Sequence, residues 1–214
     1  MNAQYLHRTA ALEGEGGVVL DEMESEGLRL AAIIDNLLAL ARLERGEEIT
    51  LEPVALARVV KRVVMRHQDQ HPERQFVLNL DPRVVAQASP VSVEQVVHNL
   101  ISNAEKYSPE GQPVKVGVQA AGHDAIVQVA DRGPGIPAPD VPHIFEPFYR
   151  STSTAGRASG LGVGLAVCKR LIEAESGQIW FEPEDGRSVF RFSLPLAGDR
   201  GADAPGRPAA VNRR

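Results

Sequence analysis

Residues 95–109, QVVHNLISNAEKYSP, carry the pattern that most limits how this chain can fold. Apolar residues recur there at three- and four-residue spacing, which predicts a helix packed on a core: Val96, Val97, Leu100, Ile101 and Ala104. Ser89 or Ser92 can cap the beginning of this helix, and Pro90 suits its first turn. Pro109 prevents the helix from continuing, because proline has no amide hydrogen to donate.

The polar residues of this helix form an unusual second face. Asn99, Asn103 and Tyr107 follow one another at four-residue spacing and share that face with Lys106. Asparagine disfavours helix interiors because its amide competes with the backbone for hydrogen bonds. A carboxamide oxygen is a suitable ligand for a Mg²⁺ ion that bridges substrate phosphates. The face therefore indicates either a ligand site or an ordinary polar helix surface.

Helical and strand patterns alternate along residues 49–196, which we expect to form one domain. A helix is expected over residues 54–67. Runs of alternating apolar and polar residues predict six strands: 75–80, 84–88, 114–120, 125–130, 178–182 and 188–193. A strand hairpin inserted between helices favours a mixed or antiparallel sheet, so the expected fold class is α+β, a two-layer α/β sandwich. Residues 197–214 are rich in Gly, Pro, Ala and Arg and predict a disordered tail.

The segment 1–48 is predicted to be helical. Apolar positions alternate at spacings of three and four, which indicates a coiled-coil or bundle seam: Leu20, Met23, Gly27, Leu30, Ile34, Leu37 and Ala41. Residues 13–17, EGEGG, suggest a turn between two helices, so we expect a helical hairpin that pairs with a second copy in a four-helix bundle. The alternative is one amphipathic helix docked on the domain.

Composition excludes several classes of protein. The net charge of −5 argues against a nucleic-acid-binding face, and the single cysteine, Cys168, excludes an internal disulfide framework and fits a reducing compartment. No apolar run approaches the roughly 20 residues that a membrane helix needs, and no signal peptide is visible. We expect a cytoplasmic chain, or the cytoplasmic part of a membrane-anchored sensor, with no membrane contact of its own.

A second candidate site begins at Asp131, where a predicted strand runs into DRGPGIP. Two glycines after a strand allow the backbone to approach a ligand closely. A carboxylate accepts hydrogen bonds, so Asp131 could bind the exocyclic amine of adenine. An ordinary turn in which aspartate bonds its own backbone is the competing interpretation.

The segment 143–167 has the composition of a latch, a flexible lid and a phosphate loop. Phe145 and Phe148 are three residues apart and would face the same side of a helical turn. The small polar run 151–159 is typical of a mobile lid. GLGVGLAV (160–167) then opens a helix, and glycines at a helix N-terminus expose the amide groups that bind phosphate.

Four of these segments together resemble the sensor histidine kinases of two-component systems. Over about residues 51–195 the family's order and spacing are matched by four motifs: the N box (99–107), the G1 box (131–137), the F box (144–150) and the G2 box (160–167). Residues 33–56 resemble the passage from the second dimerisation helix into the ATP domain. The resemblance implies the Bergerat ATP-binding fold, preceded by part of a dimeric helical hairpin.

The resemblance assigns the phosphate end of the site to four residues. Asn103 would coordinate a Mg²⁺ ion that bridges the phosphates of ATP, and Asn99 would assist it. Lys106 and Arg150 would neutralise phosphate charge, so that Asn99, Lys106 and Arg150 would contribute to catalysis. ATP and Mg²⁺ are therefore the expected cofactors.

The base and lid ends of the site follow from the same resemblance. Tyr107 would stack on adenine and Asp131 would bind its amine. The remaining residues of the expected nucleotide site are Gly133, Gly135, Ile136, Phe148, Gly160, Leu161, Gly162, Val163, Gly164 and Leu165.

One position favours phosphoryl transfer over hydrolysis. Hydrolytic members of the superfamily carry a glutamate four residues before the metal asparagine, where this chain has Asn99. An amide cannot take a proton from water, so a protein-histidine kinase is favoured over a gyrase-like ATPase. The alternatives are a non-catalytic nucleotide-binding or dimerisation module, and a serine kinase of the anti-sigma type.

The family's phosphoacceptor histidine is the missing element. It is followed by an acid-Leu-Arg/Lys-Thr-Pro-like run, and no histidine of this chain has that sequel; His7, for example, is followed by RTAA. His67, His71, His123 and His143 are interpreted as loop or surface residues, and His98 receives no role. We therefore expect a homodimer through the N-terminal helices, an acceptor histidine from an upstream segment or a partner, and a response regulator.

Overall fold

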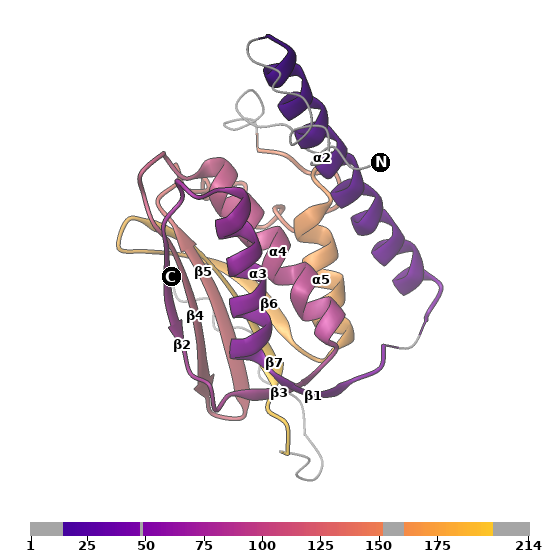
Figure 1. The fold of residues 1–214 in the computed structure, drawn as a ribbon. Coiled ribbons are helices and arrows are strands. Elements are labelled where there is room, and N and C mark those ends of the chain that lie inside the picture. Colours follow the sequence, from indigo (N-terminus) through magenta and orange to yellow (C-terminus); the bar gives the residue numbers. More distant parts are fainter. Residues whose placement is uncertain (1–14, 48, 152–160, 199–214) are drawn as a thin grey trace.

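The computed structural model describes residues 15–47, 49–151 and 161–198. Along the chain these form α2 (Glu15–Glu44), β1 (Glu52–Ala55), α3 (Leu56–Gln70), β2 (Phe76–Leu80), β3 (Val85–Ala88), α4 (Pro90–Tyr107), β4 (Val114–Ala121), β5 (Asp124–Asp131), α5 (Gly164–Ala174), β6 (Gln178–Glu184) and β7 (Arg187–Pro195). Figure 1 shows α3, α4 and α5 packed together beside the sheet. Among the described helices, none combines the length and the apolar character needed to cross a bilayer.

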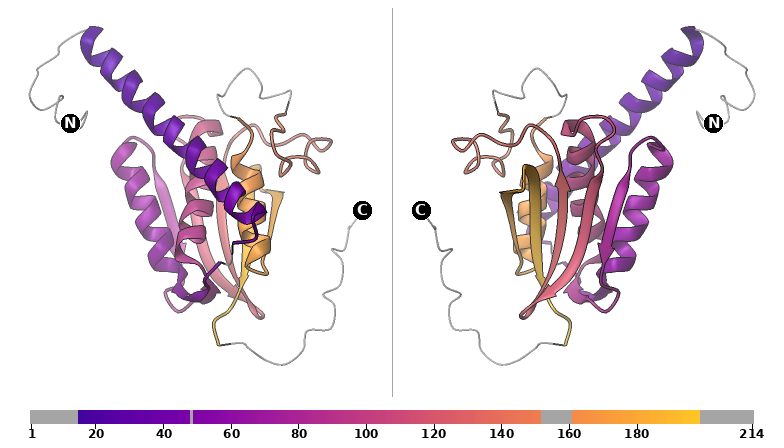
Figure 2. Two further views of the ribbon diagram at one scale, coloured as in Figure 1. Left: turned by 90° about the vertical axis from the view of Figure 1, so that its right-hand side faces the viewer. Right: turned by 90° about the vertical axis from the view of Figure 1, so that its left-hand side faces the viewer.

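The main sheet has five strands in the order β2-β4-β5-β7-β6. β2 and β4 are parallel, and every other neighbouring pair is antiparallel. The helices cover one face of this sheet, and the side views show the two layers edge-on (Figure 2). The core between the layers is built from small apolar side chains, with Val60, Val97 and Val127 fully buried. The predicted two-layer α/β sandwich with a mixed sheet is therefore confirmed.

α4 occupies the centre of the helical layer, because its apolar stripe faces the sheet. Ser89 caps it by accepting a hydrogen bond from the amide of Ser92 at 3.4 Å, and Pro90 is its first residue. The buried carboxylate of Glu175, at the end of α5, accepts from the Ser89 amide at 3.1 Å. The start of α4 is thus held by its own cap and by α5, while its C-terminal turns carry the polar face.

The strand β1 was not predicted. Glu52–Ala55 pair with β3 in a separate two-stranded sheet, so α3 begins at Leu56 and not at the predicted residue 54. Only Val54 of this strand is buried, so the sequence shows no alternating pattern there. Pro53 is tolerated because it lies in a strand at the edge of a sheet.

α2 is a single 30-residue helix. It begins at Glu15, so the turn predicted for 13–17 is wrong where the structure describes it, since residues 15–17 are helical. The expected first helix of the hairpin lies outside the described residues. Figure 1 shows the N-terminal half of α2 projecting away from the sandwich, while Leu40 and Leu43 near its end pack against the core.

The expected seam of α2 faces solvent. Met23, Leu30, Ile34 and Leu37 are all exposed, Met23 to 67%. The helix therefore has two apolar faces: one docks its C-terminal part on the domain, and the seam faces away from the other described elements. Pairing of this helix with a second copy of the chain and docking of the helix on the domain were alternatives in the sequence analysis. Since the two would use different faces of the helix, they are compatible with each other.

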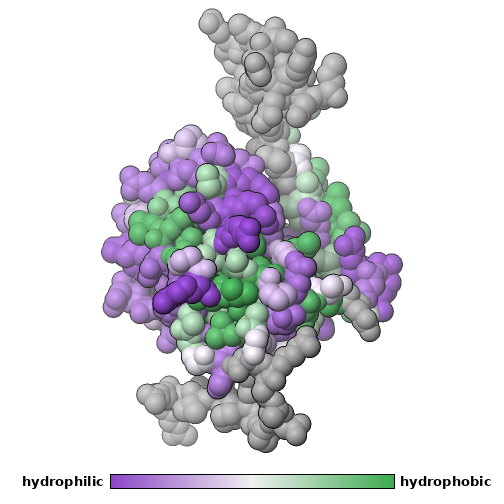
Figure 3. All heavy atoms as spheres, turned by 60° about the horizontal axis from the view of Figure 1, so that its bottom comes forward, coloured by the Kyte–Doolittle hydropathy of each residue, from purple (hydrophilic) through white to green (hydrophobic). Residues whose placement is uncertain are grey.

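A smaller apolar surface lies at the end of the molecule that carries β1, β3 and the start of α4. Figure 3 views this end and shows apolar side chains framed by polar ones. Val91, in the first turn of α4, is 73% exposed there.

Candidate functional site

A cavity of about 1130 Å³ opens between α4, the loop after β5, the start of α5 and α2. Fourteen of the residues expected to bind nucleotide or metal line it: Asn99, Asn103, Lys106, Tyr107, Asp131, Gly133, Gly135, Ile136, Arg150, Leu161, Gly162, Val163, Gly164 and Leu165. Two expected residues do not: Gly160 lies outside the described residues, and Phe148 is exposed and does not line the cavity. The fold therefore brings together four motifs that are far apart in the sequence.

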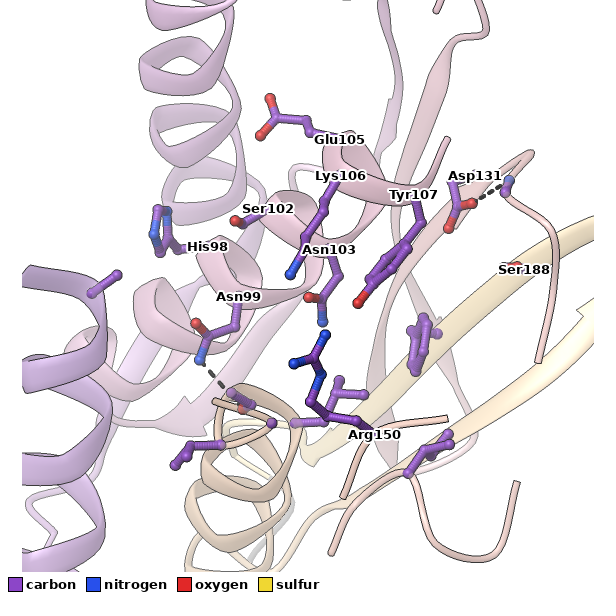
Figure 4. A pocket seen from close by; sticks show the side chains of 18 of the residues that line it. His98, Asn99, Ser102, Asn103, Glu105, Lys106, Tyr107, Asp131, Arg150 and Ser188 are labelled. Atoms are coloured by element: carbon purple, nitrogen blue, oxygen red, sulfur yellow. Dashed lines mark hydrogen bonds between the residues drawn. The ribbon is translucent and has the colours of Figure 1, made fainter. Parts of the chain in front are cut away.

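The polar face of α4 forms one wall of this cavity. Figure 4 shows Asn103, Lys106 and Tyr107 leaving the last turns of the helix toward the open space, and Arg150 reaching up toward Asn103 from the opposite side. The ammonium of Lys106 lies 5.3 Å from the centre of the Tyr107 ring. Two cationic side chains and an amide thus converge on one region, which suits a multiply charged anion.

Asp131, the last residue of β5, forms the opposite end of the cavity. The residue is 5% exposed, and its carboxylate accepts a hydrogen bond from the amide of Gly133 at 2.5 Å. Burial raises the pKa of Asp131 to about 6, against an ordinary value of 3.8, although the Gly133 bond opposes that shift. The predicted turn is present, since one carboxylate oxygen is bonded to its own loop, and the residue also lines the cavity, where the adenine-binding role stays a prediction.

Gly133 is required by close packing in this loop. A Cβ atom on it would lie 2.7 Å from the Asp131 carboxylate and 3.1 Å from the carbonyl oxygen of Tyr107. The loop therefore passes directly beneath the end of α4, and any larger residue would push Asp131 and Tyr107 apart.

The glycine segment reaches the cavity at the N-terminus of α5. Gly162 has a φ of +71°, and a Cβ atom on it would lie 2.6 Å from the carbonyl oxygen of Tyr149. The Phe148 amide donates to the Gly162 carbonyl at 3.0 Å, so the segment before the undescribed residues meets the segment after them. The first residues of α5 line the cavity together with Arg150 and Asn99, and the N-terminus of a helix favours an anion.

The expected Phe145–Phe148 latch is wrong. Phe145 packs edge-to-face on Phe190, with ring centres 6.5 Å apart, whereas Phe148 is 67% exposed and has a φ of +65°. The segment consists of turns and not of a helix, so spacing by three does not place the two rings on one side. Phe148 accordingly lies outside the residues that line the cavity.

Asn36 of α2 is a site residue that sequence reasoning missed. Its side chain is buried against α4, where the Asn99 amide donates to its oxygen at 2.9 Å and its own amide donates to the Asn99 oxygen at 3.4 Å. Gln95 donates to the same Asn36 oxygen at 3.2 Å. The one available signal was an asparagine interrupting the apolar run AAIIDNLLALA.

The prediction of a loop or surface position for His67 is wrong. His67 is buried in α3, where its Nδ1 lies 2.8 Å from Glu105 and its Nε2 lies 2.9 Å from Nδ1 of His98. Both histidines and Glu105 line the α2 side of the cavity, and burial lowers the pKa of His98. The expectation of a surface position holds for His71, His123 and His143, which are exposed.

The expected phosphate end of the cavity is lined by amide and cationic side chains, and not by a cluster of carboxylates that would hold a metal ion. In the part of the chain that the structure describes, no three His, Cys, Asp or Glu side chains form a metal cluster. The two α4 asparagines suit a Mg²⁺ ion whose remaining ligands are waters and phosphates, which is how this ion is commonly held. Cys168 does not contribute a thiolate, since its complete burial raises its pKa to about 12.

Comparison with known protein families gives one sequence-profile match, which covers residues 88–198 and is described as histidine kinase-, DNA gyrase B- and HSP90-like ATPase. Sensor histidine kinase TrcS of Mycobacterium tuberculosis is 32% identical over 183 residues. That match covers 83% of this chain and 36% of TrcS, so the chain spans about a third of this relative.

Solved structures of histidine kinases also superpose on this fold. The mycobacterial sensor histidine kinase MprB superposes with a TM-score of 0.62 and 27% identity, over 68% of this chain and 97% of that one. Full-length ShkA in complex with AMPPNP superposes with a TM-score of 0.68 and 26% identity, over 91% of this chain and 41% of that one.

Proposed function

Because the chain belongs to the family of histidine kinase-, DNA gyrase B- and HSP90-like ATPases, we propose that it is the ATP-binding catalytic part of a two-component sensor histidine kinase. It transfers the γ-phosphate of ATP to a histidine of a dimerisation helix, for relay to a response regulator. The observation that carries this proposal is the convergence of the α4 polar face, Asp131, Arg150 and the α5 glycines on one cavity.

The cavity suggests how ATP lies in it. Asp131 accepts a hydrogen bond from the adenine amine at the buried end, and Tyr107 stacks on the base. Lys106, Arg150 and the first amides of α5 hold the phosphates at the other end. Asn103, assisted by Asn99, contributes amide oxygens to Mg²⁺, which when bound neutralises charge on the phosphates. The bound AMPPNP of ShkA, an ATP analogue, supports this class of ligand.

Asn99 supports transfer over hydrolysis. Its amide is buried between Asn36 and the carbonyl of Gly164, and it offers no group that would take a proton from water. In the transfer step a nitrogen of the acceptor imidazole bonds to the γ-phosphorus, the bond to the bridging oxygen breaks, and ADP leaves with the electron pair. The chain's own part in that step is to hold the phosphates in line and stabilise their charge.

The acceptor is a histidine of an upstream segment or of a partner. His67 is bonded to His98 and to Glu105, and neither histidine is followed by the acceptor-type sequence. We therefore expect the chain alone to bind Mg-ATP without becoming labelled.

Incubation with γ-labelled ATP tests the proposal. The chain is incubated alone and with a histidine-bearing dimerisation hairpin, and the label is then exposed to acid and to base. Acid-labile, base-stable label on the hairpin, absent when Asn103→Ala is used, supports the kinase. Acid-stable label would identify a serine kinase, and ATP binding without any transfer would identify a regulatory module.

A further inference from the structure

Asp140 holds the two residues on either side of Arg150. The Tyr149 hydroxyl donates to one carboxylate oxygen of Asp140 at 2.9 Å, and the Ser151 hydroxyl donates to the other oxygen. Arg150 lies between these two residues in sequence and lines the cavity, whereas Asp140 itself is not among the lining residues. One carboxylate thus fixes the chain immediately before and immediately after the arginine.

The anchored segment has no regular secondary structure. Residues 145–148 form turns and bends, and Phe148 and Arg150 are exposed. The Phe148 amide is bonded to the Gly162 carbonyl at 3.0 Å, and the Tyr149 amide to the Glu146 carbonyl at 3.3 Å. These bonds set the path of the chain up to Tyr149, and the two Asp140 bonds hold the chain on both sides of Arg150.

A carboxylate suits this position because it offers two acceptor oxygens to two hydroxyl donors. Hydrogen bonds from hydroxyls to an ionised acceptor are stronger than those between neutral groups. The Ser151 and Tyr149 hydroxyls lower the pKa of Asp140 accordingly, and His143 adds a smaller effect in the same direction. The Tyr149 ring also packs on His143, with ring centres 5.4 Å apart, so the tyrosine is held at both ends.

An arginine that reaches a phosphate from an exposed loop depends on such anchoring. Its side chain has many rotamers, and ordering them costs conformational entropy even when the backbone is fixed. Figure 4 shows the Arg150 guanidinium directed toward Asn103, across the cavity. A backbone free to shift by a few ångströms would add to the entropy lost each time this contact forms.

We propose that Asp140 is a positioning residue for Arg150, which it aims at the phosphates of the bound nucleotide by holding Tyr149 and Ser151. The proposal rests on the phosphate-binding role proposed for Arg150. It assigns Asp140 no contact with the nucleotide, so its effect passes through Arg150 alone.

Affinities for ATP and for adenosine, measured by calorimetry on the full chain, test this inference. Arg150→Ala and Asp140→Ala should each weaken ATP binding, roughly tenfold, and leave adenosine binding within about twofold. Because both residues act through the contact of Arg150 with the phosphates, the double variant should bind ATP no more weakly than Arg150→Ala does. Tyr149→Phe combined with Ser151→Ala should reproduce Asp140→Ala while keeping the carboxylate. Glu146→Gln changes another carboxylate of the same segment and should bind both ligands normally.

The contradicting outcomes separate this inference from the proposed function. Normal ATP binding by Asp140→Ala beside a weakened Arg150→Ala would overturn the positioning role and leave the nucleotide site standing. An equal loss of ATP and adenosine binding in Asp140→Ala would show a general defect of the loop and overturn it too. Normal ATP binding by Arg150→Ala would overturn the phosphate-binding role of Arg150 itself. If Asp140→Ala fails to fold, the affinities for ATP and adenosine are compared in Asp140→Asn and in the Tyr149→Phe, Ser151→Ala double variant instead.

Discussion

Burial and hydrogen bonds, more than contacts between charged groups, set the properties of single residues at the site. Asp131 has a pKa of about 6 because its carboxylate is almost completely enclosed, and Asn99 is held by amide and carbonyl groups and not by an ion pair. Part of this could be read from the sequence, since the residue types and their spacing indicated an acceptor and a polar helix face. The enclosure of Asp131 and the pairing of Asn99 with Asn36 depend on tertiary contacts, which spacing along one element does not encode.

Asp131 should make stability depend on pH. Its pKa is raised in the folded protein, so between pH 4 and pH 6 the folded state keeps a proton that the unfolded state loses. The unfolding free energy should therefore decrease as pH rises through this window, by about 3 kcal/mol in total relative to Asp131→Asn. Urea unfolding of both proteins at several pH values measures the difference. A difference that stays constant from pH 4 to pH 7 would contradict the burial argument.

At the scale of elements, strong local sequence patterns were sufficient to predict a helix or strand, and weak patterns were not. The helix around Asn99 and Asn103 was predicted because its apolar stripe, cap and terminating proline agree. β1 was missed because it buries a single residue, and the Phe145–Phe148 segment was misread because turns have no fixed side-chain period. His67 was taken for a surface residue although its helix buries it against α4.

The docking of α2 should depend on Asn36. Asn36→Ala removes the partner of the buried Asn99 amide and should weaken the docking of this helix by about 1–3 kcal/mol. Hydrogen exchange of residues 36–44 should then become faster, while the exchange of α4 and of the central strands stays slow. Asn79→Ala, an exposed position on β2, is the matched control. Unchanged exchange in α2 would show that Leu40 and Leu43 hold the helix without the amide pair.

At the scale of the whole molecule, the fold was predicted from the order of its elements. A hairpin between helices indicated a mixed sheet in a two-layer sandwich, and the structure has that arrangement. The described residues leave the seam of α2 exposed, so a partner for it is a matter for the assembly. The apolar residues of the seam are spaced as in a helical bundle and lie clear of the domain.

A second copy covering the seam should be measurable in solution. Leu30→Glu with Ile34→Glu places charges on the seam, so a dimer of the wild-type chain should become monomeric. Light scattering after size-exclusion chromatography gives the masses. Glu26→Lys, a charge change on the same helix, should leave the dimer intact. A wild-type chain that stays monomeric at high concentration would contradict a self-sufficient dimer interface.

The central claim is that the cavity beside α4 binds ATP through Mg²⁺ held by Asn103. Calorimetric titration of ATP, with Mg²⁺ and with EDTA, into the wild type and Asn103→Ala tests it most directly. We predict that Mg²⁺ strengthens ATP binding to the wild type by roughly tenfold or more, since a charge-assisted ligand is gained. Asn103→Ala should bind ATP with little dependence on Mg²⁺ and should bind adenosine normally. Equal Mg²⁺ dependence in the two proteins would contradict the assignment, and absence of ATP binding by the wild type would contradict the account as a whole.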